Sequence, residues 1–225
     1  MNTKKLFYIT LVISIVVQII TGVIELATLF VKVPSDFSLM RQLLWLEVIV
    51  QTIEGGFYYW LAYNFNKVAN ITPKRYMDWV ITTPTMLVTL ILYLIYIDVK
   101  EKDNTDLELF TLAKQHSGVI LPVLILNWMM LVFGYLGEMR IIPVLTGVVI
   151  GFIPFLLFYY LIYENYYSEK GASLFWYFFL FWSLYGVVAV LPYYLKNSLY
   201  NILDLFAKNF FGIFLSYMIW TGKYL

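Results

Sequence analysis

The sequence contains no cysteine and a single histidine, His116. The lack of cysteine excludes disulfide bonds, thiolate metal sites and cysteine nucleophiles. One histidine cannot form the histidine clusters that catalytic metal sites commonly use, so we expect no metal site. Charged residues make up only 13% of the 225 residues, and the formal net charge is +1, which disfavours a nucleic-acid partner.

Apolar sequence takes the place of charge, because 62% of the residues are hydrophobic, well above the share in soluble domains. Seven apolar runs of about 20 residues or more are each long enough to cross a bilayer as a helix. They cover residues 6–31, 42–63, 77–98, 117–137, 140–163, 173–195 and 197–220. The composition therefore predicts an all-α, multi-pass integral membrane protein with one domain over residues 1–225.

The segments between the runs leave two questions open. The longest polar stretch, residues 99–116, ends in a segment that fits either a helix lying in the membrane interface or a solvated loop. Lysine and arginine are spread evenly between the two sides, so the positive-inside rule does not decide the orientation. The first run lacks a small-residue cleavage site, and we expect it to be retained as the first helix.

Four charged residues lie inside or at the edge of apolar runs: Arg75, Asp78, Asp204 and Lys208. A charge in the middle of a membrane span costs at least about 2.5–3.5 kcal/mol. Asp204 and Lys208 are four residues apart and share a helix face, and the two acids balance the two bases. The set is either a stabilising ion-pair network or a site that needs the lysine for chemistry.

Four motifs resemble those of the microbial (type I) rhodopsins. RYMDWVITTP at 75–84 resembles their third helix, and LDLFAKNFFG at 203–212 resembles their seventh. WSLYG at 182–186 and GYLGE at 134–138 resemble parts of the sixth and fourth helices, with Gly186 where the family usually has proline. The resemblance covers the whole chain. It implies a seven-helix bundle with the N-terminus outside and the C-terminus in the cytoplasm.

The resemblance also implies a cofactor site. The sequence has no nucleotide-binding loop and no nucleophile constellation, so we do not expect an enzyme. Lys208 would bind all-trans retinal as a protonated Schiff base, with Asp78 and Asp204 as counterions. The other residues that the resemblance places around retinal are Trp79, Thr82, Thr83, Met130, Gly134, Trp182 and Tyr185. Ordinary packing stays an alternative for the aromatic members, because 20% of the chain is aromatic.

Polar residues recur at helical spacing on three of the predicted spans. The sets are Ser14, Gln18, Thr21 and Glu25; Glu47, Gln51, Glu54 and Tyr58; and Asn197, Asn201, Asp204 and Lys208. Each set draws a stripe down one helix face, and the first, second and seventh helices are neighbours in the type I fold. Such stripes either hold a file of water or bond one another across helices.

One position bears on the direction of ion transport. Outward proton pumps of this family usually carry a carboxylic acid eleven residues after the first counterion, where this chain has Thr89. That threonine, with Ser14, Glu47, Glu54 and Asn197, resembles the group 1 viral rhodopsins of large algal viruses, which are light-gated cation channels.

We therefore expect a light-gated channel for monovalent cations or protons, surrounded by membrane lipid. The predicted path runs along helices one, two, three and seven, past Ser14, Glu47, Gln51, Glu54, Arg75, Asn197 and Asn201. The alternatives are a weak light-driven outward proton pump and a photosensor that signals through a partner. A homo-oligomer also stays open.

Overall fold

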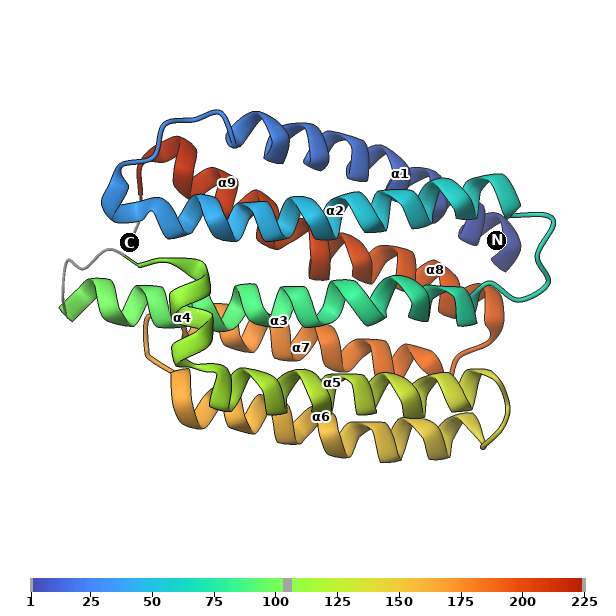
Figure 1. The fold of residues 1–225 in the computed structure, drawn as a ribbon. Helices are drawn as coiled ribbons and strands as arrows, with labels where there is room; N and C mark the ends of the chain where they lie inside the picture. The colour runs from blue at the N-terminus through green and yellow to red at the C-terminus, as the bar shows by residue number, and fades with distance from the viewer. Residues whose placement is uncertain (1, 103–106, 224–225) are drawn as a thin grey trace.

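The computed structural model describes residues 2–102 and 107–223 and arranges them as long helices side by side (Figure 1). The continuous helices of the bundle are α1 (Thr3–Thr28), α2 (Ser38–Asn64), α3 (Thr72–Lys102), α5 (Ser117–Glu138), α6 (Val144–Tyr166) and α7 (Ala172–Ala189). A last rod joins α8 (Tyr193–Asp204), the π-helical turn η2 (Leu205–Asn209) and α9 (Phe210–Thr221). A 3-10 turn, η1 (Ser35–Phe37), precedes α2.

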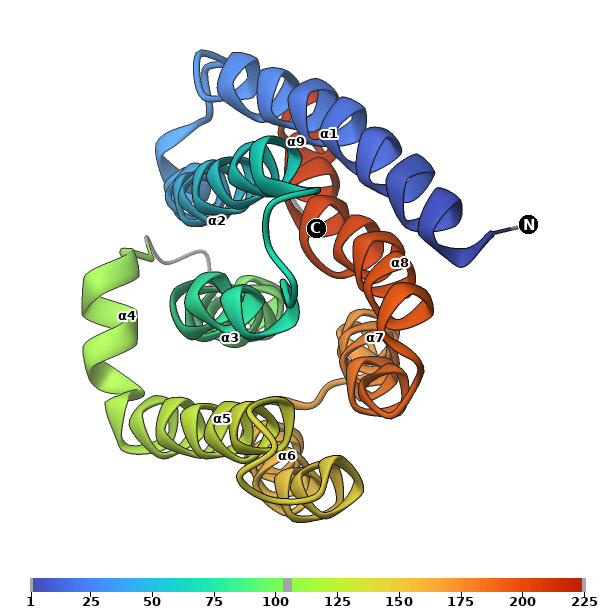
Figure 2. The same ribbon diagram turned by 90° about the vertical axis from the view of Figure 1, so that its right-hand side faces the viewer.

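The view along the bundle shows α3 near the centre, with the other rods around it (Figure 2). α1 packs on α2, α8 and α9, while α3 packs between α2 and α5. The two chain ends lie at opposite ends of the bundle (Figure 1), as an odd number of crossings requires. We call these the N-terminal end and the C-terminal end of the bundle.

The described helices have the length and composition of membrane spans. Six rods are long and apolar enough to cross a membrane: α1, α3, α5, α6, α7 and the α8–α9 rod. α2 is less apolar, because Glu47, Gln51 and Glu54 interrupt it, but it lies alongside α1 and α3. Large apolar side chains on the outer faces of α1, α5 and α6 are exposed, as contact with lipid requires.

Most predicted runs differ from the helices by several residues at one end or both, and at two of them the helical backbone breaks beside a proline. The run over 173–195 does not form one helix, because α7 ends at Ala189 and the chain turns before Pro192. The run over 140–163 enters its helix only after Pro143. Proline disfavours helical backbone in the residue before it and lacks an N–H group, so it favours the start of a helix directly after it. Pro84, Pro122 and Pro154 instead lie inside α3, α5 and α6 without dividing them.

The described part of the polar stretch 99–116 is largely helical. α3 extends to Lys102, residues 103–106 lie outside the described residues, and α4 (Leu109–Gln115) crosses the direction of the bundle (Figure 2). Leu109 and Leu112 are buried, Phe110 is exposed, and the Leu109 N–H donates to Gln42 Oε1 at 2.8 Å. α4 is therefore tied to α2 by one face.

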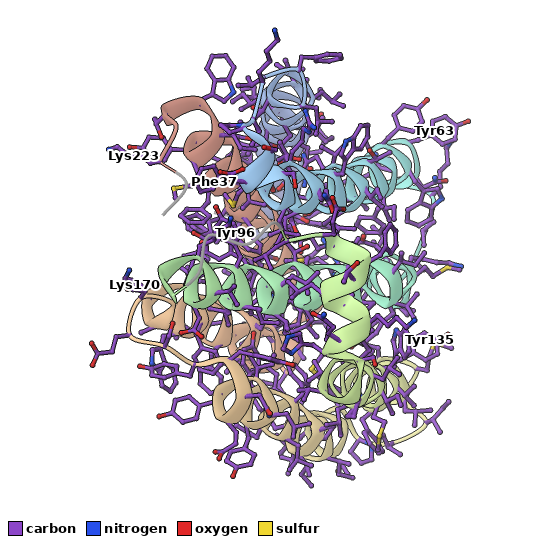
Figure 3. All side chains as sticks on the ribbon, turned by 60° about the vertical axis from the view of Figure 1, so that its left-hand side comes forward. Phe37, Tyr63, Tyr96, Tyr135, Lys170 and Lys223 are labelled. Atoms are coloured by element: carbon purple, nitrogen blue, oxygen red, sulfur yellow. The ribbon has the colours of Figure 1, made fainter. Side chains whose placement is uncertain are left out.

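Aromatic and basic side chains mark the ends of the bundle (Figure 3). Tyr63 and Tyr135 lie toward the N-terminal end, and Lys170 and Lys223 toward the C-terminal end. Lys67 Nζ lies 3.5 Å from the centre of the Tyr63 ring. Aromatic rings near the ends of spans are typical of the two membrane–water boundaries.

Candidate functional site

Three carboxyl groups from three helices surround the amine of Lys208. Lys208 lies in η2, part-way along the last rod, and is only 3% exposed. Its Nζ donates a hydrogen bond to Asp78 Oδ2 on α3, and it lies 3.8 Å from Glu54 Oε1 on α2 and 3.9 Å from Asp204 Oδ1 on α8. A π turn inside an α-helix frequently marks a functional site.

The two predicted counterions are held in different ways. Asp204 accepts hydrogen bonds from Tyr58 Oη at 2.7 Å, from Tyr185 Oη at 2.7 Å and from Arg75 Nη1 at 3.2 Å. Asp78 bonds Lys208 through Oδ2, and its Oδ1 has no hydrogen-bond partner within the described part of the chain. Asp204 is therefore anchored, whereas Asp78 depends on Lys208.

Arg75 occupies the interior on the N-terminal side of Lys208. Its guanidinium is fully buried, and Nε donates to Asn197 Oδ1 at 3.0 Å while Nη2 donates to Asn201 Oδ1. Asn197 Nδ2 in turn donates to Thr72 Oγ1 at 3.0 Å. These bonds tie α3 to α8 around the Arg75 guanidinium.

Glu54 changes the charge expected from the sequence. The four charged residues of the two motifs cancel, but the structure adds a fully buried fifth group, Glu54, beside Lys208. With all five ionised, two positive and three negative charges leave one net negative charge. Both Glu54 oxygens lack a hydrogen-bond partner among the described residues. The cluster therefore favours an additional positive charge.

A largely apolar cavity extends from Lys208 between α3, α5, α6 and α7. Of the residues predicted around retinal, Trp79, Thr83, Met130, Gly134, Trp182 and Tyr185 line it. Thr82 does not line it and instead donates to the Asp78 backbone carbonyl at 3.1 Å. Other lining residues are not indicated by the motifs, and they include Tyr76, Met86, Leu131, Gly147, Gly151, Phe152, Phe155 and Tyr200.

Two glycines shape the cavity wall. A Cβ at Gly134 would lie 2.6 Å from the Tyr76 hydroxyl, and a Cβ at Gly186 would lie 2.6 Å from a Phe152 ring carbon. The Phe152 ring thus packs against the position where the family usually has proline. An amine at one end, with aromatic walls beyond it, fits a long apolar aldehyde such as retinal.

The polar stripes meet in the interior and bond one another. Toward the N-terminal end, Ser14 Oγ donates to the Asn201 carbonyl at 3.1 Å. On the other side of Lys208, Gln51 Nε2 and Asn209 Nδ2 donate to Thr21 Oγ1 at 2.8 and 2.7 Å. Gln18 Nε2 donates to Asn209 Oδ1 at 3.3 Å. We call Gln18, Thr21, Gln51 and Asn209 the amide cluster.

The structure separates some of the predicted pathway residues from the others. Ser14, Glu54, Arg75, Asn197 and Asn201 gather around Lys208 or on its N-terminal side. Glu47 lies beyond the amide cluster, next to Glu25 and the Thr89 hydroxyl. Asn209 was missed because it lies off the predicted stripe of the seventh span, and the π turn brings it inward.

The geometry defines a seven-helix membrane protein with a buried lysine at the end of an apolar cavity. Comparison with protein families gives the same class: residues 8–222 match the model of the bacteriorhodopsin-like proteins. The chain belongs to this family of microbial rhodopsins, which are retinal-binding light-driven transporters or sensors rather than enzymes. The predictions of a type I rhodopsin and of a multi-pass membrane protein are confirmed.

Solved structures support the assignment. The viral rhodopsin OLPVRII is 28% identical, with a TM-score of 0.80 and 99% of each chain covered. The blue light-absorbing proteorhodopsin from Med12 is 18% identical, with a TM-score of 0.75 and 97% of this chain and 98% of that chain covered. The proton pumping rhodopsin AR2 from the marine alga Acetabularia acetabulum is 22% identical, with a TM-score of 0.67 and coverages of 100% and 97%. The latter two share the fold. A comparison with curated proteins gives no match.

Proposed function

We propose that the protein is a light-gated cation channel with all-trans retinal bound to Lys208. One observation supports this function above others: buried polar side chains follow α1, α2 and the α8–α9 rod through the interior, past Lys208. Carboxyl groups recur along this line at Glu54, Glu47 and Glu25. Rings or rows of acidic side chains are the usual means by which a pore favours cations. In this proposal the N-terminal end faces outside and the C-terminal end faces the cytoplasm.

Retinal, when bound as an imine, supplies the absorption of visible light and a change of shape. Lys208 and Asn209 are consecutive residues of η2, so a displacement of Lys208 acts directly on Asn209. The Asn209 amide donates to Thr21 Oγ1 at 2.7 Å and to Gln51 Oε1 at 3.2 Å. Separation of these groups would let water enter between α1, α2 and η2.

In this proposal the amide cluster is the first barrier to ions, and Arg75 is the second. A cation that moves along the line must pass a buried guanidinium, which repels it. Because Arg75 is held by Asn197, Asn201 and Asp204, loss of those bonds is needed before the N-terminal side can conduct. Asp204 therefore links this barrier to the retinal-binding lysine, because it holds Arg75 and lies 3.9 Å from Lys208 Nζ.

Voltage-clamped photocurrents from cells supplied with retinal test this function. A channel gives a current that reverses near a cation equilibrium potential and shifts with the external cation. Asn197→Leu should reduce this current while the absorption maximum stays, because Asn197 bonds Arg75 and lies outside the contacts of Lys208. Glu54→Gln should also reduce it. Glu164→Gln, an exposed acid on α6, is the matched control.

A weak outward proton pump is the second candidate. It is favoured by the hydrogen bond between Lys208 and Asp78, an acid without another partner on Oδ1 in the described chain. A pump would give current in one direction at every voltage tested, and illuminated cells would acidify their medium. A coloured protein at the cell surface that gives no current would instead support the photosensor.

A further inference from the structure

Glu25 and Glu47 form a pair of buried acids that the predicted site does not explain. Glu25 on α1 is 1% exposed and Glu47 on α2 is 2% exposed. Each lies one turn from a residue of the amide cluster, Thr21 on α1 and Gln51 on α2, and these two bond each other at 2.8 Å, so the antiparallel helices bring the two acids to the same level of the bundle. Among residues 2–102 and 107–223, neither forms an ion pair with a lysine or arginine. Two acids without a counter-charge are costly in a low-dielectric interior.

The oxygen atoms of this pair are also short of hydrogen bonds. Both oxygens of Glu47 and Oε2 of Glu25 have no partner in the described part of the chain. The Thr89 hydroxyl lies beside Glu47 but donates to the Thr85 carbonyl at 3.1 Å. Ser216 Oγ, one turn after Gly212 on α9, is buried without a partner as well. The interior here offers oxygen acceptors and few donors.

Gly212 provides the space for this arrangement. A Cβ at Gly212 would lie 2.0 Å from Glu25 Oε1, so only glycine lets the carboxyl group sit against α9. Gly212 follows Lys208 by four residues, which places Glu25 about one helical turn beyond the lysine. The pair thus lies on the line of polar side chains, on the C-terminal side of the amide cluster.

A second cavity, between α1 and α2, reaches Glu25 but is not lined by Glu47. Gln18, Gly22, Glu25, Val48 and Gln51 are among the residues that line it. The cavity therefore connects the amide cluster with Glu25. Its lining also includes Ile19, Val23 and Leu26, which are exposed apolar side chains on the outer face of α1.

We propose that Glu25 and Glu47 form an internal site for one small positive ion, either a proton or an alkali cation. Carboxylate and hydroxyl oxygens are the ligands that hard cations prefer, and a proton shared by two acids meets the same charge requirement. The charged groups on the adjacent elements do not supply it. Lys208 on η2 is held by Asp78, with Glu54 and Asp204 nearby, and Thr89 and Ser216 are neutral.

Only the role of this site, as a binding position on the cation pathway, rests on the proposed function. Its occupancy is a property of the protein in the dark and requires no current. A bound positive ion would offset the repulsion between the Glu25 and Glu47 carboxylates while the bonds of the amide cluster are intact. Passage of that ion toward Lys208 would then follow the opening of the cluster.

The test compares purified, retinal-loaded protein in the dark with the variants Glu25→Gln, Glu47→Gln and the double variant. Infrared spectra in water and heavy water detect a protonated carboxyl stretch. Thermal unfolding in sodium chloride and in N-methylglucamine chloride, at equal ionic strength, detects a bound alkali cation. Glu164→Gln controls for loss of one exposed acid on α6.

We expect one of two signatures in the wild type. A deuterium-sensitive carboxyl band that Glu25→Gln or Glu47→Gln removes identifies a proton. A sodium-dependent rise of about 2–4 °C in the unfolding midpoint that the double variant loses identifies an alkali cation. If the double variant does not fold, Glu47→Gln alone carries the comparison. Neither signature, or signatures that survive both substitutions, would overturn the site.

The outcomes separate the site from the channel. A dark-state signature in a protein that passes no current keeps the site and rejects the proposed function. A conducting protein without either signature rejects the site and keeps the channel. Glu164→Gln should behave as the wild type in both measurements.

Discussion

Lys196 at the start of α8 forms a buried ion pair with Glu138 at the end of α5. The two side chains are 9% and 5% exposed, and they join helices that are distant in the sequence. The pair lies at the N-terminal end of the bundle, away from Lys208. It ties the wall of the apolar cavity to the rod that carries the lysine.

Removing one member of this pair should destabilise the protein. Glu138→Gln leaves the Lys196 charge buried without its partner, which costs about 3–5 kcal/mol. Combining it with Lys196→Met should recover most of the loss, because no unpaired charge remains. Thermal unfolding followed by visible absorbance measures both variants. Equal stability of Glu138→Gln and the wild type would show that water satisfies the lysine.

Gly212→Ala should perturb Glu25 in particular. The added methyl group would overlap the Glu25 carboxyl, and overpacking of a tight site costs about 1–3 kcal/mol. The double variant Gly212→Ala with Glu25→Ala should lose less than the sum of the two single changes. Gly55→Ala on α2 is the control, because its Cβ would meet no atom within 4 Å. Additive losses would contradict direct contact between the two residues.

Lys208→Ala should yield a colourless protein. Alanine has no amine to form an imine, so retinal cannot be attached covalently at this position. The visible absorption spectrum of protein purified with added retinal is the measurement. Lys223→Ala, a change of an exposed lysine at the C-terminal end, should keep its colour. Visible absorbance that survives Lys208→Ala would remove this lysine from the site.

Asp78→Asn should shift the absorption maximum to longer wavelength by more than Asp204→Asn does. A negative charge beside the retinal-bearing nitrogen stabilises the ground state, and its effect declines with distance. Asp78 bonds Lys208 directly, whereas Asp204 Oδ1 is 3.9 Å away and is also held by Arg75, Tyr58 and Tyr185. Spectra of the two variants at neutral pH provide the comparison. A larger shift from Asp204→Asn would show that Asp204, and not Asp78, has the stronger electrostatic effect on the retinal-bearing nitrogen.

The sequence carries local information well and long-range packing poorly. Asp204 and Lys208 share a helix face by spacing alone, and Asp78 was tied to them through a motif. The inward position of Asn209 depends on a π turn. The place of Tyr76 in the cavity wall depends on the packing of α3 against α5, and spacing along the sequence predicts neither. Pro143 and Pro192 divide two apolar runs, but hydropathy alone does not register the break.

The stripes illustrate the same limit. Their helical spacing correctly predicts that Glu25 and Glu47 share a face with other polar residues, and the structure buries both. Which side chains meet across helices depends on how α1 and α2 are aligned along their axes. That alignment puts Glu47 beside Glu25 and Thr89, and leaves Glu54 next to Lys208.

The π turn at Leu205–Asn209 also bears on how this helix tolerates changes in length. Such a turn carries one residue more than an α-helical turn. Deleting one residue within it would restore plain α-helix and leave α8 and α9 in place, at the expense of the Lys208 position. The same deletion within α8 would rotate the rest of the rod by about 100°. Within the described rod, a single-residue deletion in this turn would therefore change the position of Lys208. It would leave α8 and α9 aligned with their neighbours.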